Sequence, residues 1–146
     1  GAHVVVKHFG ARDECLGLYD SWAKERKINN QDRIYQGMLE DSRIALKNAL
    51  DNYSDLNFIG RVIRIGREIK AFTFGFKLNK DTFCILYEIT DLSIKGLAQF
   101  IFRRFSGDLE GYRYINIMDD SGLENLKKVK LSYQPAKLIP AYIVKR

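Results

Sequence analysis

Residues 83–118 read FCILYEITDLSIKGLAQFIFRRFSGDLEGYRYINIM, and this stretch decides the fold. Phe83 to Ile89 alternates between apolar and other residues, as a half-buried strand does. Ile94 to Phe105 then follows a helical period, and Tyr112 to Met118 returns to a strand pattern. A strand, a crossover helix and a second strand form a parallel pair when both strands join one sheet. We therefore expect an α/β fold that contains a parallel pair.

The flanking sequence supplies further helices and strands. Asp13 to Lys27 and Gln31 to Asn52 have helical spacing. Ile59 to Ile65 and Ile69 to Leu78 alternate as strands and should form an antiparallel meander with the strand that starts at Phe83. The remaining expected elements are an edge strand within His3–Phe9, a helix over Ser121–Tyr133 and a strand over Ala136–Val144. Together they predict a mixed, mostly antiparallel sheet flanked by helices.

Two side-chain patterns within residues 83–118 bear on the chemistry. Strict alternation places one set of strand residues on one face of the sheet, and this set is Phe83, Ile85, Tyr87 and Ile89. Glu88 then lies on the opposite face, with Cys84 and Leu86. The helical period predicts a buried stripe formed by Leu97, Phe100, Ile101 and Phe105.

Length and composition favour one ordinary globular domain. A chain of 146 residues, of which 46% are hydrophobic, can bury a core without staples. No repeat or linker divides it, so we expect a single domain over residues 1–146, with residues 1–12 as an N-terminal lead. Gly1-Ala2 is interpreted as a cloning remnant.

Several classes of protein are disfavoured by what the chain contains. Two cysteines and two histidines are too few for a disulfide framework and leave little for a metal site. No apolar run approaches the roughly 20 residues that span a bilayer. The first residues also lack the pattern of a signal peptide. We therefore expect a cytoplasmic protein with no transmembrane segment and no metal.

The excess positive charge is confined to the C-terminal region. The chain has 24 basic and 18 acidic residues, a net charge of +6. Residues 1–124 are neutral overall, and residues 125–146 hold the remaining basic residues and no acid. Such a segment would attract the phosphates of a tRNA or an anionic lipid headgroup. A solvated basic helix face and tail is the competing interpretation.

Three segments resemble motifs of a known family. Residues 69–75, IKAFTFG, resemble a strand motif I-x-A-F-T-x-G, and residues 114–122, YINIMDDSG, resemble Y-I-N followed by D-x-G. Residues 126–135, LKKVKLSYQP, resemble L-[RK]-x-x-K-x-x-[YF]-x-P, which is the most specific of the three. With Tyr142, these segments resemble the phosphatidylglycerol lysyltransferase C-terminal family, which has a GNAT-like acyltransferase fold.

The resemblance implies an acyl or aminoacyl transferase. The best-understood enzymes of that family move an amino acid from aminoacyl-tRNA to a lipid headgroup. Their two GNAT-like halves are in tandem, and this chain resembles the second half. One alternative is therefore a catalytically incomplete half that acts as a pairing or binding module, completed by a second GNAT-like half or a homodimer. Another alternative is a CoA-dependent N-acetyltransferase, so the donor substrate is either acyl-CoA or aminoacyl-tRNA.

The candidate donor-binding residues follow from the resemblance to GNAT enzymes. Their phosphate loop, R/Q-x-x-G-x-G/A, opens a helix whose backbone N–H groups bind pyrophosphate. The matching window contains Ser93, Lys95, Gly96 and Ala98. Ser93 stands where Arg or Gln is expected, which counts against CoA, and Lys95 would replace the lost charge. Gly96 as a simple helix start is the competing interpretation.

The other candidate residues lie near the cleft that GNAT-like folds form where the sheet splays, which the resemblance implies here too, or in the C-terminal block. Glu88, at the end of a central strand, would act as general base or hold the amino group of the donor, unless it is an ordinary surface carboxylate. Asn116 would face the cleft, and Tyr133 would present its hydroxyl at the rim unless it belongs to the core. Lys127 and Lys130 would bind donor phosphates. Asp119 and Asp120 would bind a cationic substrate group, or cap the helix that starts at Ser121.

Overall fold

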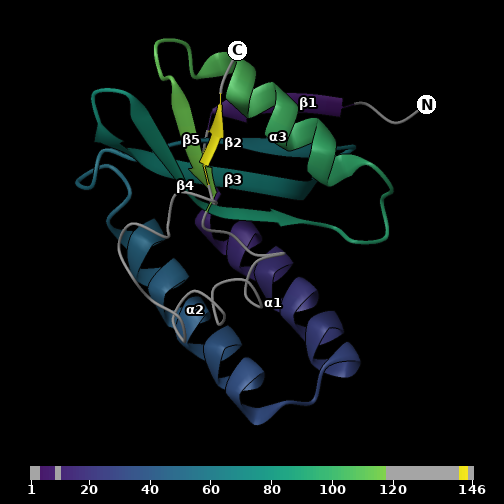
Figure 1. The fold of residues 1–146 in the computed structure, drawn as a ribbon. Helices are drawn as coiled ribbons and strands as arrows, with labels where there is room; N and C mark the ends of the chain where they lie inside the picture. The colour runs from purple at the N-terminus through teal and green to yellow at the C-terminus, as the bar shows by residue number, and fades with distance from the viewer. Residues whose placement is uncertain (1–3, 9–10, 118–141, 145–146) are drawn as a thin grey trace.

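The computed structural model describes residues 4–8, 11–117 and 142–144, which form a sheet and three helices (Figure 1). The strands are β1 Val4–His8, β2 Ile59–Ile65, β3 Glu68–Asn79, β4 Thr82–Thr90, β5 Tyr114–Ile117 and β6 Tyr142–Val144. The helices are α1 Arg12–Asn29, α2 Arg33–Asp51 and α3 Leu97–Asp108. The six strands stand in the order β1-β2-β3-β4-β5-β6. Within it β4 and β5 are parallel and the other neighbours antiparallel. The predicted mixed, mostly antiparallel sheet is therefore confirmed.

The sheet separates two layers of helices. The helices α1 and α2 cover one face, and α3 covers the other (Figure 1). The larger core lies on the α1/α2 face, where Tyr19, Leu39 and Phe72 are almost fully buried. On the α3 face, two smaller clusters form around Phe105 and around Ile101.

Most elements begin and end close to where the sequence predicts them. The edge strand, both N-terminal helices, the three-stranded meander and the parallel crossover are confirmed, with β2 matching its expected range, Ile59–Ile65. The helix expected over Ser121–Tyr133 lies outside the described residues, as does most of the strand expected over Ala136–Val144. No helix among the described residues is long and apolar enough to cross a membrane.

Helix α3 differs from its prediction at two points. It begins at Leu97 instead of Ile94, because Gly96 has a left-handed backbone, with φ of 82°, that a regular helix cannot include. The preceding residues form a turn in which the Ile94 amide donates to the Asp91 carbonyl. Phe100 is also not part of the buried stripe: 44% of it is exposed, whereas Leu97, Ile101 and Phe105 are buried as predicted.

The alternation predicted for β4 is wrong, because the strand contains a β-bulge. Phe74 of β3 pairs with Tyr87, but the next residue, Gly75, pairs with Ile85, so Leu86 is an extra residue in β4. Because of the extra residue, the side chains after Leu86 lie on the face opposite to the one that regular alternation predicts. Phe83 and Ile85 pack in the cluster around Phe105 on the α3 face, and Tyr87 and Ile89 belong to the core on the α1/α2 face.

Candidate functional site

The parallel pairing of β4 and β5 is described for only part of β4. It runs from Thr82–Tyr114 to Ile85–Ile117, where the described part of β5 ends. Beyond Ile85, β4 continues for five residues to Thr90, and no described strand lies on that side. We call this side of Leu86–Thr90 the opening between β4 and β5.

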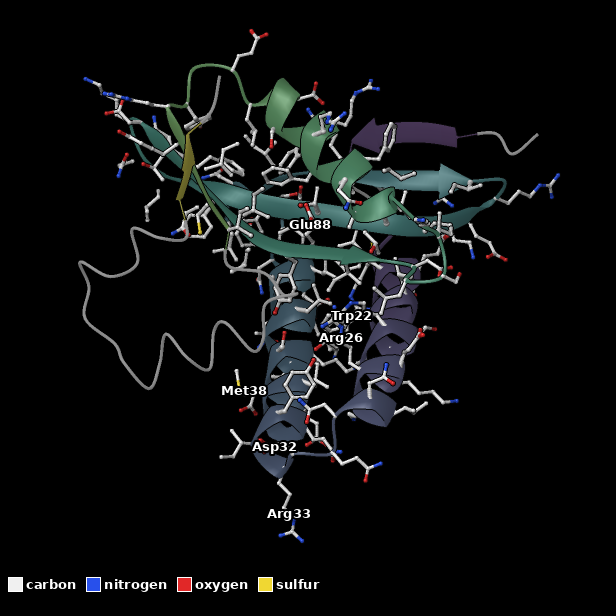
Figure 2. The ribbon with its side chains drawn as sticks, turned by 45° about the vertical axis from the view of Figure 1, so that its right-hand side comes forward. Trp22, Arg26, Asp32, Arg33, Met38 and Glu88 are labelled. Carbon is white, nitrogen blue, oxygen red and sulfur yellow. The ribbon has the colours of Figure 1, made fainter. Side chains whose placement is uncertain are left out.

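Glu88 lies on β4 beyond the last residue that pairs with β5. It pairs with Thr73 of β3, which in turn pairs with Arg61 of β2, so the three residues form a polar row across the sheet. The row lies on the α3 face, and Figure 2 shows Glu88 between the sheet and α3, with Trp22 and Arg26 on the other side. Arg61 binds Asp108 of α3 at 3.1 Å, which ties this row to the helix.

Asn116 lies on the opposite face from Glu88. Its neighbour Ile115 packs with Phe105 under α3, so Asn116 points toward the α1/α2 side of the sheet. Asn116 is only 4% exposed, and its side-chain oxygen has no hydrogen-bond partner among the described residues. The structure therefore places Glu88 and Asn116 on opposite faces of the sheet, with Asn116 beside Cys84 in the paired part of β4 and β5.

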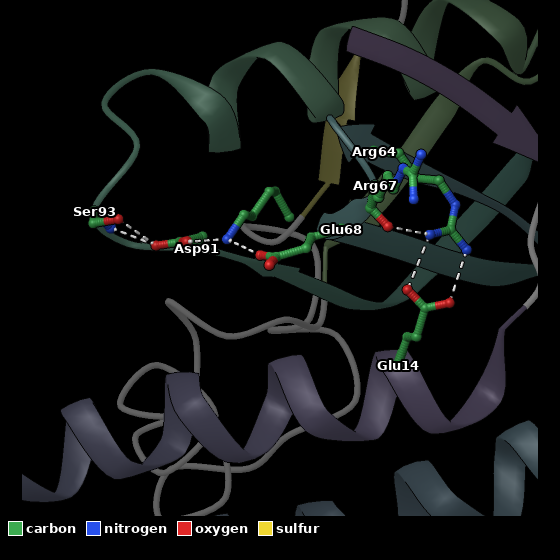
Figure 3. A network of polar contacts seen from close by, with 7 residues as sticks. Glu14, Arg64, Arg67, Glu68, Asp91 and Ser93 are labelled. Atoms are coloured by element: carbon green, nitrogen blue, oxygen red, sulfur yellow. Dashed lines mark hydrogen bonds and ion pairs between the residues drawn. The ribbon is translucent and has the colours of Figure 1, made fainter. Parts of the chain in front are cut away.

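The loop between β4 and α3 is held by a network of polar contacts (Figure 3). One Asp91 oxygen accepts hydrogen bonds from the Ser93 amide at 2.9 Å and the Ser93 hydroxyl at 2.6 Å. The other oxygen binds the Lys70 ammonium at 3.4 Å, and Lys70 also binds Glu68 at 2.8 Å. Hydrogen bonds from Ser93 are the main cause that lowers the pKa of Asp91, with Lys70 adding to them. Ser93 is thus engaged in shaping the loop.

The N-terminus of α3 is open to solvent. Gly96 is the N-cap residue of α3. Since glycine has no side chain, the cap residue accepts no hydrogen bond from the first N–H groups of the helix through a side chain. Lys95 and Ala98 are both exposed beside it. The structure therefore brings three of the expected donor-binding residues together at a helix end that favours negative charge.

A cavity of about 300 Å³ lies on the α1 side of the same loop. Its lining combines Trp22 of α1 with Glu68, Lys70 and Asp91. Glu68 and Asp91 already bind Lys70, and Glu14, another lining residue, binds Arg64 through two bonds of 2.9 Å. The charged side chains that line the cavity are therefore mostly acidic, and its lysine is already bound by Glu68 and Asp91.

Cys84 has no part in this chemistry. It is 1% exposed, and burial raises the pKa of its thiol to about 11. A thiol with that pKa is protonated at neutral pH and is a poor nucleophile. The sequence interpretation of Cys84 as a small buried residue is confirmed.

Some site features were missed by the sequence analysis, and others lie outside the structure. Thr73 was missed, although Gly75 inside a strand pattern is a known signal of a bulge or a close backbone approach. The Asp91–Ser93 turn was missed too, although an Asp two residues before a Ser is a common turn pattern. The remaining candidates, Asp119, Asp120, Lys127, Lys130 and Tyr133, lie outside the described residues.

Comparison with known proteins places the chain in a family. A family model described as "Phosphatidylglycerol lysyltransferase, C-terminal" matches residues 2–145. The chain belongs to the phosphatidylglycerol lysyltransferase C-terminal family. No curated protein matches this member of the family.

One solved structure is similar to this chain in both sequence and fold. A conserved protein of unknown function from Bacteroides thetaiotaomicron is 35% identical over 90% of this chain, with a TM-score of 0.70. The match covers 44% of that structure, so the lysyltransferase-family chain spans less than half of its length.

More distant structures share the fold. A GNAT-family acetyltransferase from Staphylococcus aureus matches 89% of this chain and 82% of its own, at 10% identity and a TM-score of 0.61. A diaminobutyrate acetyltransferase from Paenibacillus lautus, solved with its substrate and coenzyme A, matches 91% of this chain and 75% of its own, at 15% identity and a TM-score of 0.53. The fold of this family member is GNAT-like.

Proposed function

We propose that this chain works in acyl transfer, and that it binds an activated acyl donor in the opening between β4 and β5. The observation that carries the proposal is the helix N-terminus at Gly96, which lies in the loop that follows β4 and makes no side-chain cap hydrogen bond. Such a helix end binds the phosphate of the donor, and the β4 backbone from Leu86 to Thr90 would bind its extended arm.

Each candidate residue has a role in this proposal. Glu88 takes the proton of the acceptor or holds the amino group of the donor, and Asn116 offers a polar group on the far side of the opening. The end of α3, with Lys95 and Ala98, receives a phosphate. Two further groups of residues are assigned from the sequence alone: Lys127, Lys130 and Tyr133 on the donor side, and Asp119 and Asp120 for a cationic group.

We favour aminoacyl-tRNA over acyl-CoA as the donor. Membership of a lysyltransferase family supports an aminoacyl donor. Ser93 supports it as well, because the position where CoA enzymes are expected to carry Arg or Gln holds a hydroxyl that binds Asp91. The basic residues 125–146 would then contact tRNA or an anionic lipid headgroup. This reaction would take place in the cytoplasm or at the inner membrane surface.

Ligand-dependent thermal stability tests the proposal. We expect lysyl-tRNA at 100 times its dissociation constant to stabilise the protein by about 2.7 kcal/mol, and acetyl-CoA to have no effect. Ala98→Glu, which places a carboxylate beside the phosphate site, should abolish the shift. Ala45→Glu is the matched control, since Ala45 is an exposed alanine of α2. A shift with acetyl-CoA alone would instead support the N-acetyltransferase alternative.

A catalytically incomplete half is the second candidate function. It is favoured by the observation that the chain spans 44% of its solved relative. This alternative predicts no shift with either donor for the isolated chain, and a shift once a second GNAT-like half or a second copy is present. Sedimentation analysis, followed by the same melting experiment on a longer protein that contains both halves, distinguishes the two candidates.

A further inference from the structure

We infer that Thr73 and Gly75 of β3 are positioning residues for the proposed transfer. They hold the bulge at Leu86, and the bulge determines on which face of the sheet Glu88 lies. The inference rests on the proposed function for its catalytic meaning, because that function assigns the donor to the opening beside Glu88. The contacts that hold the bulge stand independently of it.

The bulge changes the surroundings of Glu88 completely. Phe83 and Ile85 lie on the α3 face, so unbroken alternation would place Tyr87 on that face as well and Glu88 on the other. Glu88 would then replace Tyr87 in the apolar core against α1 and α2, where an unpaired carboxylate is costly. The extra residue, Leu86, restores Tyr87 to that core and turns Glu88 toward α3.

Gly75 permits the bulge because the two backbones approach too closely for any side chain. A Cβ atom on Gly75 would lie 1.9 Å from the Cys84 carbonyl oxygen and 2.9 Å from the Ile85 Cα. Both contacts are with backbone atoms, which cannot rotate away. Any larger residue would therefore push β4 away from β3 at the point where the register changes.

Thr73 binds the backbone of β4 beside the bulge. A bulge interrupts the regular exchange of hydrogen bonds between two strands, and buried carbonyl groups need partners. The Thr73 hydroxyl donates a 2.9 Å hydrogen bond to the Tyr87 carbonyl, and Thr73 itself is fully buried. A side chain of β3 thus fixes the backbone of β4 immediately before Glu88.

The bulge also lies where the described pairing with β5 ends. Ile85 is the last residue of β4 with a described partner in β5, and the extra residue, Leu86, follows it directly. Bulges bend a strand and increase its local twist. Thr73 and Gly75 therefore determine the course of β4 beyond Ile85 and the face on which Glu88 lies.

The experiment compares Thr73→Val with Thr73→Ser. Valine has the same shape but cannot donate a hydrogen bond, whereas serine keeps the hydroxyl. Thr82→Val is the matched control, because Thr82 is also a buried threonine but lies at the other end of β4. Two quantities are measured for each variant: amide hydrogen exchange at Leu86–Glu88, and the stabilisation by lysyl-tRNA and by acetyl-CoA.

We expect exchange at Leu86–Glu88 to become about tenfold faster in Thr73→Val, the effect of losing one hydrogen bond locally. The donor-dependent shift should also be lost. Thr73→Ser and Thr82→Val should keep both properties. A merely structural role would lower stability but leave donor binding intact in the folded protein, so a Thr73→Val protein that still binds the donor as tightly as the wild type would overturn the positioning role.

The two measurements distinguish failure of the proposed function from failure of the inference about Thr73. If the wild-type protein is stabilised by neither donor, the proposed function of the isolated chain is contradicted, and the exchange data still decide whether Thr73 holds the bulge. Unchanged exchange in Thr73→Val contradicts that role whatever the donor result. If Thr73→Val does not fold, Thr73→Ala also removes the hydroxyl, without branching at Cβ, and takes its place in the same comparison.

Discussion

At Gly75, the backbones of β3 and β4 lie so close that a single methyl group does not fit between them. At two further points, contacts of single residues fix the backbone near the candidate site. Thr73 holds the Tyr87 carbonyl, and Asp91 holds Ser93 and Lys70 at the start of the loop. At the residue scale, the register of β3 and β4 and the shape of the loop before α3 therefore depend on contacts within the protein.

Gly75→Ala should destabilise the protein by about 3 kcal/mol, the upper end of the usual cost of overpacking, because the added Cβ meets backbone atoms. Gly37→Ala is the matched control. Gly37 lies within α2, and a Cβ there would meet nothing within 4 Å. The control should therefore stabilise the protein by about 0.5–1 kcal/mol. Urea unfolding measures both, and equal stability of the two variants would contradict the close approach.

Asp91→Asn should change how stability depends on pH. The pKa of Asp91 is lowered in the folded protein, so its carboxylate contributes stability above the unfolded pKa, and this contribution is lost as the pH falls through the folded pKa. The difference in unfolding free energy between wild type and variant should therefore be constant between about pH 7 and pH 5 and shrink below about pH 4. Urea titrations at several pH values measure it.

The control for Asp91 is Asp41→Asn. Asp41 is exposed on α2, and none of the described residues forms an ion pair or side-chain hydrogen bond with it. Its substitution should change the unfolding free energy by no more than about 0.5 kcal/mol, as exposed positions usually do. A difference for Asp91→Asn that stays constant down to pH 3 would show that the contribution of Asp91 does not depend on its ionisation.

At the scale of elements, α3 depends on one stripe of residues. Leu97, Ile101 and Phe105 are buried against the sheet, and Phe105 packs edge-on against Phe83 at 5.7 Å. Phe100 has a similar size and lies on the same helix, but it is largely exposed. The helix carries the proposed phosphate site at its first turn, so its attachment to the sheet bears directly on function.

Phe105→Ala should cost about 3–5 kcal/mol, because it removes a fully buried ring. Phe100→Ala should change the unfolding free energy by no more than about 0.5 kcal/mol, as exposed positions usually do. Chemical denaturation of both variants measures the difference. Equal losses would mean that Phe100 is covered in the folded protein.

At the scale of the whole molecule, one sheet serves two unequal cores. The α1/α2 face holds a continuous cluster that includes Trp22, the single tryptophan of the chain. The α3 face holds two clusters, and the row formed by Arg61, Thr73 and Glu88 runs across the sheet on that face. The proposed role of Glu88 therefore belongs to the face with the smaller cores.

Both faces should unfold together, because they share the same strands. Ile101→Ala removes a fully buried side chain from the α3 face and should cost about 2–5 kcal/mol. Trp22 fluorescence reports on the opposite face, yet its midpoint should fall as far as the midpoint seen by far-UV circular dichroism. Separate midpoints for the two probes would show instead that the α3 layer unfolds independently.

Local patterns were enough to predict the elements and their order. The alternation over Ile59–Ile65 and the helical spacing over Asp13–Lys27 arise from burial on one side of each element, which leaves a period in the sequence. The parallel pair also followed from the pattern, because a helix between two strands of one sheet allows little else. The motifs at residues 69–75, 114–122 and 126–135 predicted the family.

The arrangement of the candidate site was decided by tertiary structure. The face on which Glu88 lies depends on the bulge in β4. The bulge requires a glycine at position 75 of the neighbouring strand β3, and the alternation of residues within β4 cannot reveal this. The separation of Glu88 from Asn116 follows from the same bulge. The Ser93 hydroxyl is likewise taken up by a partner within the folded loop. Periodicity records which residues are buried on average, whereas register and close approach depend on pairs of residues that only the fold brings together.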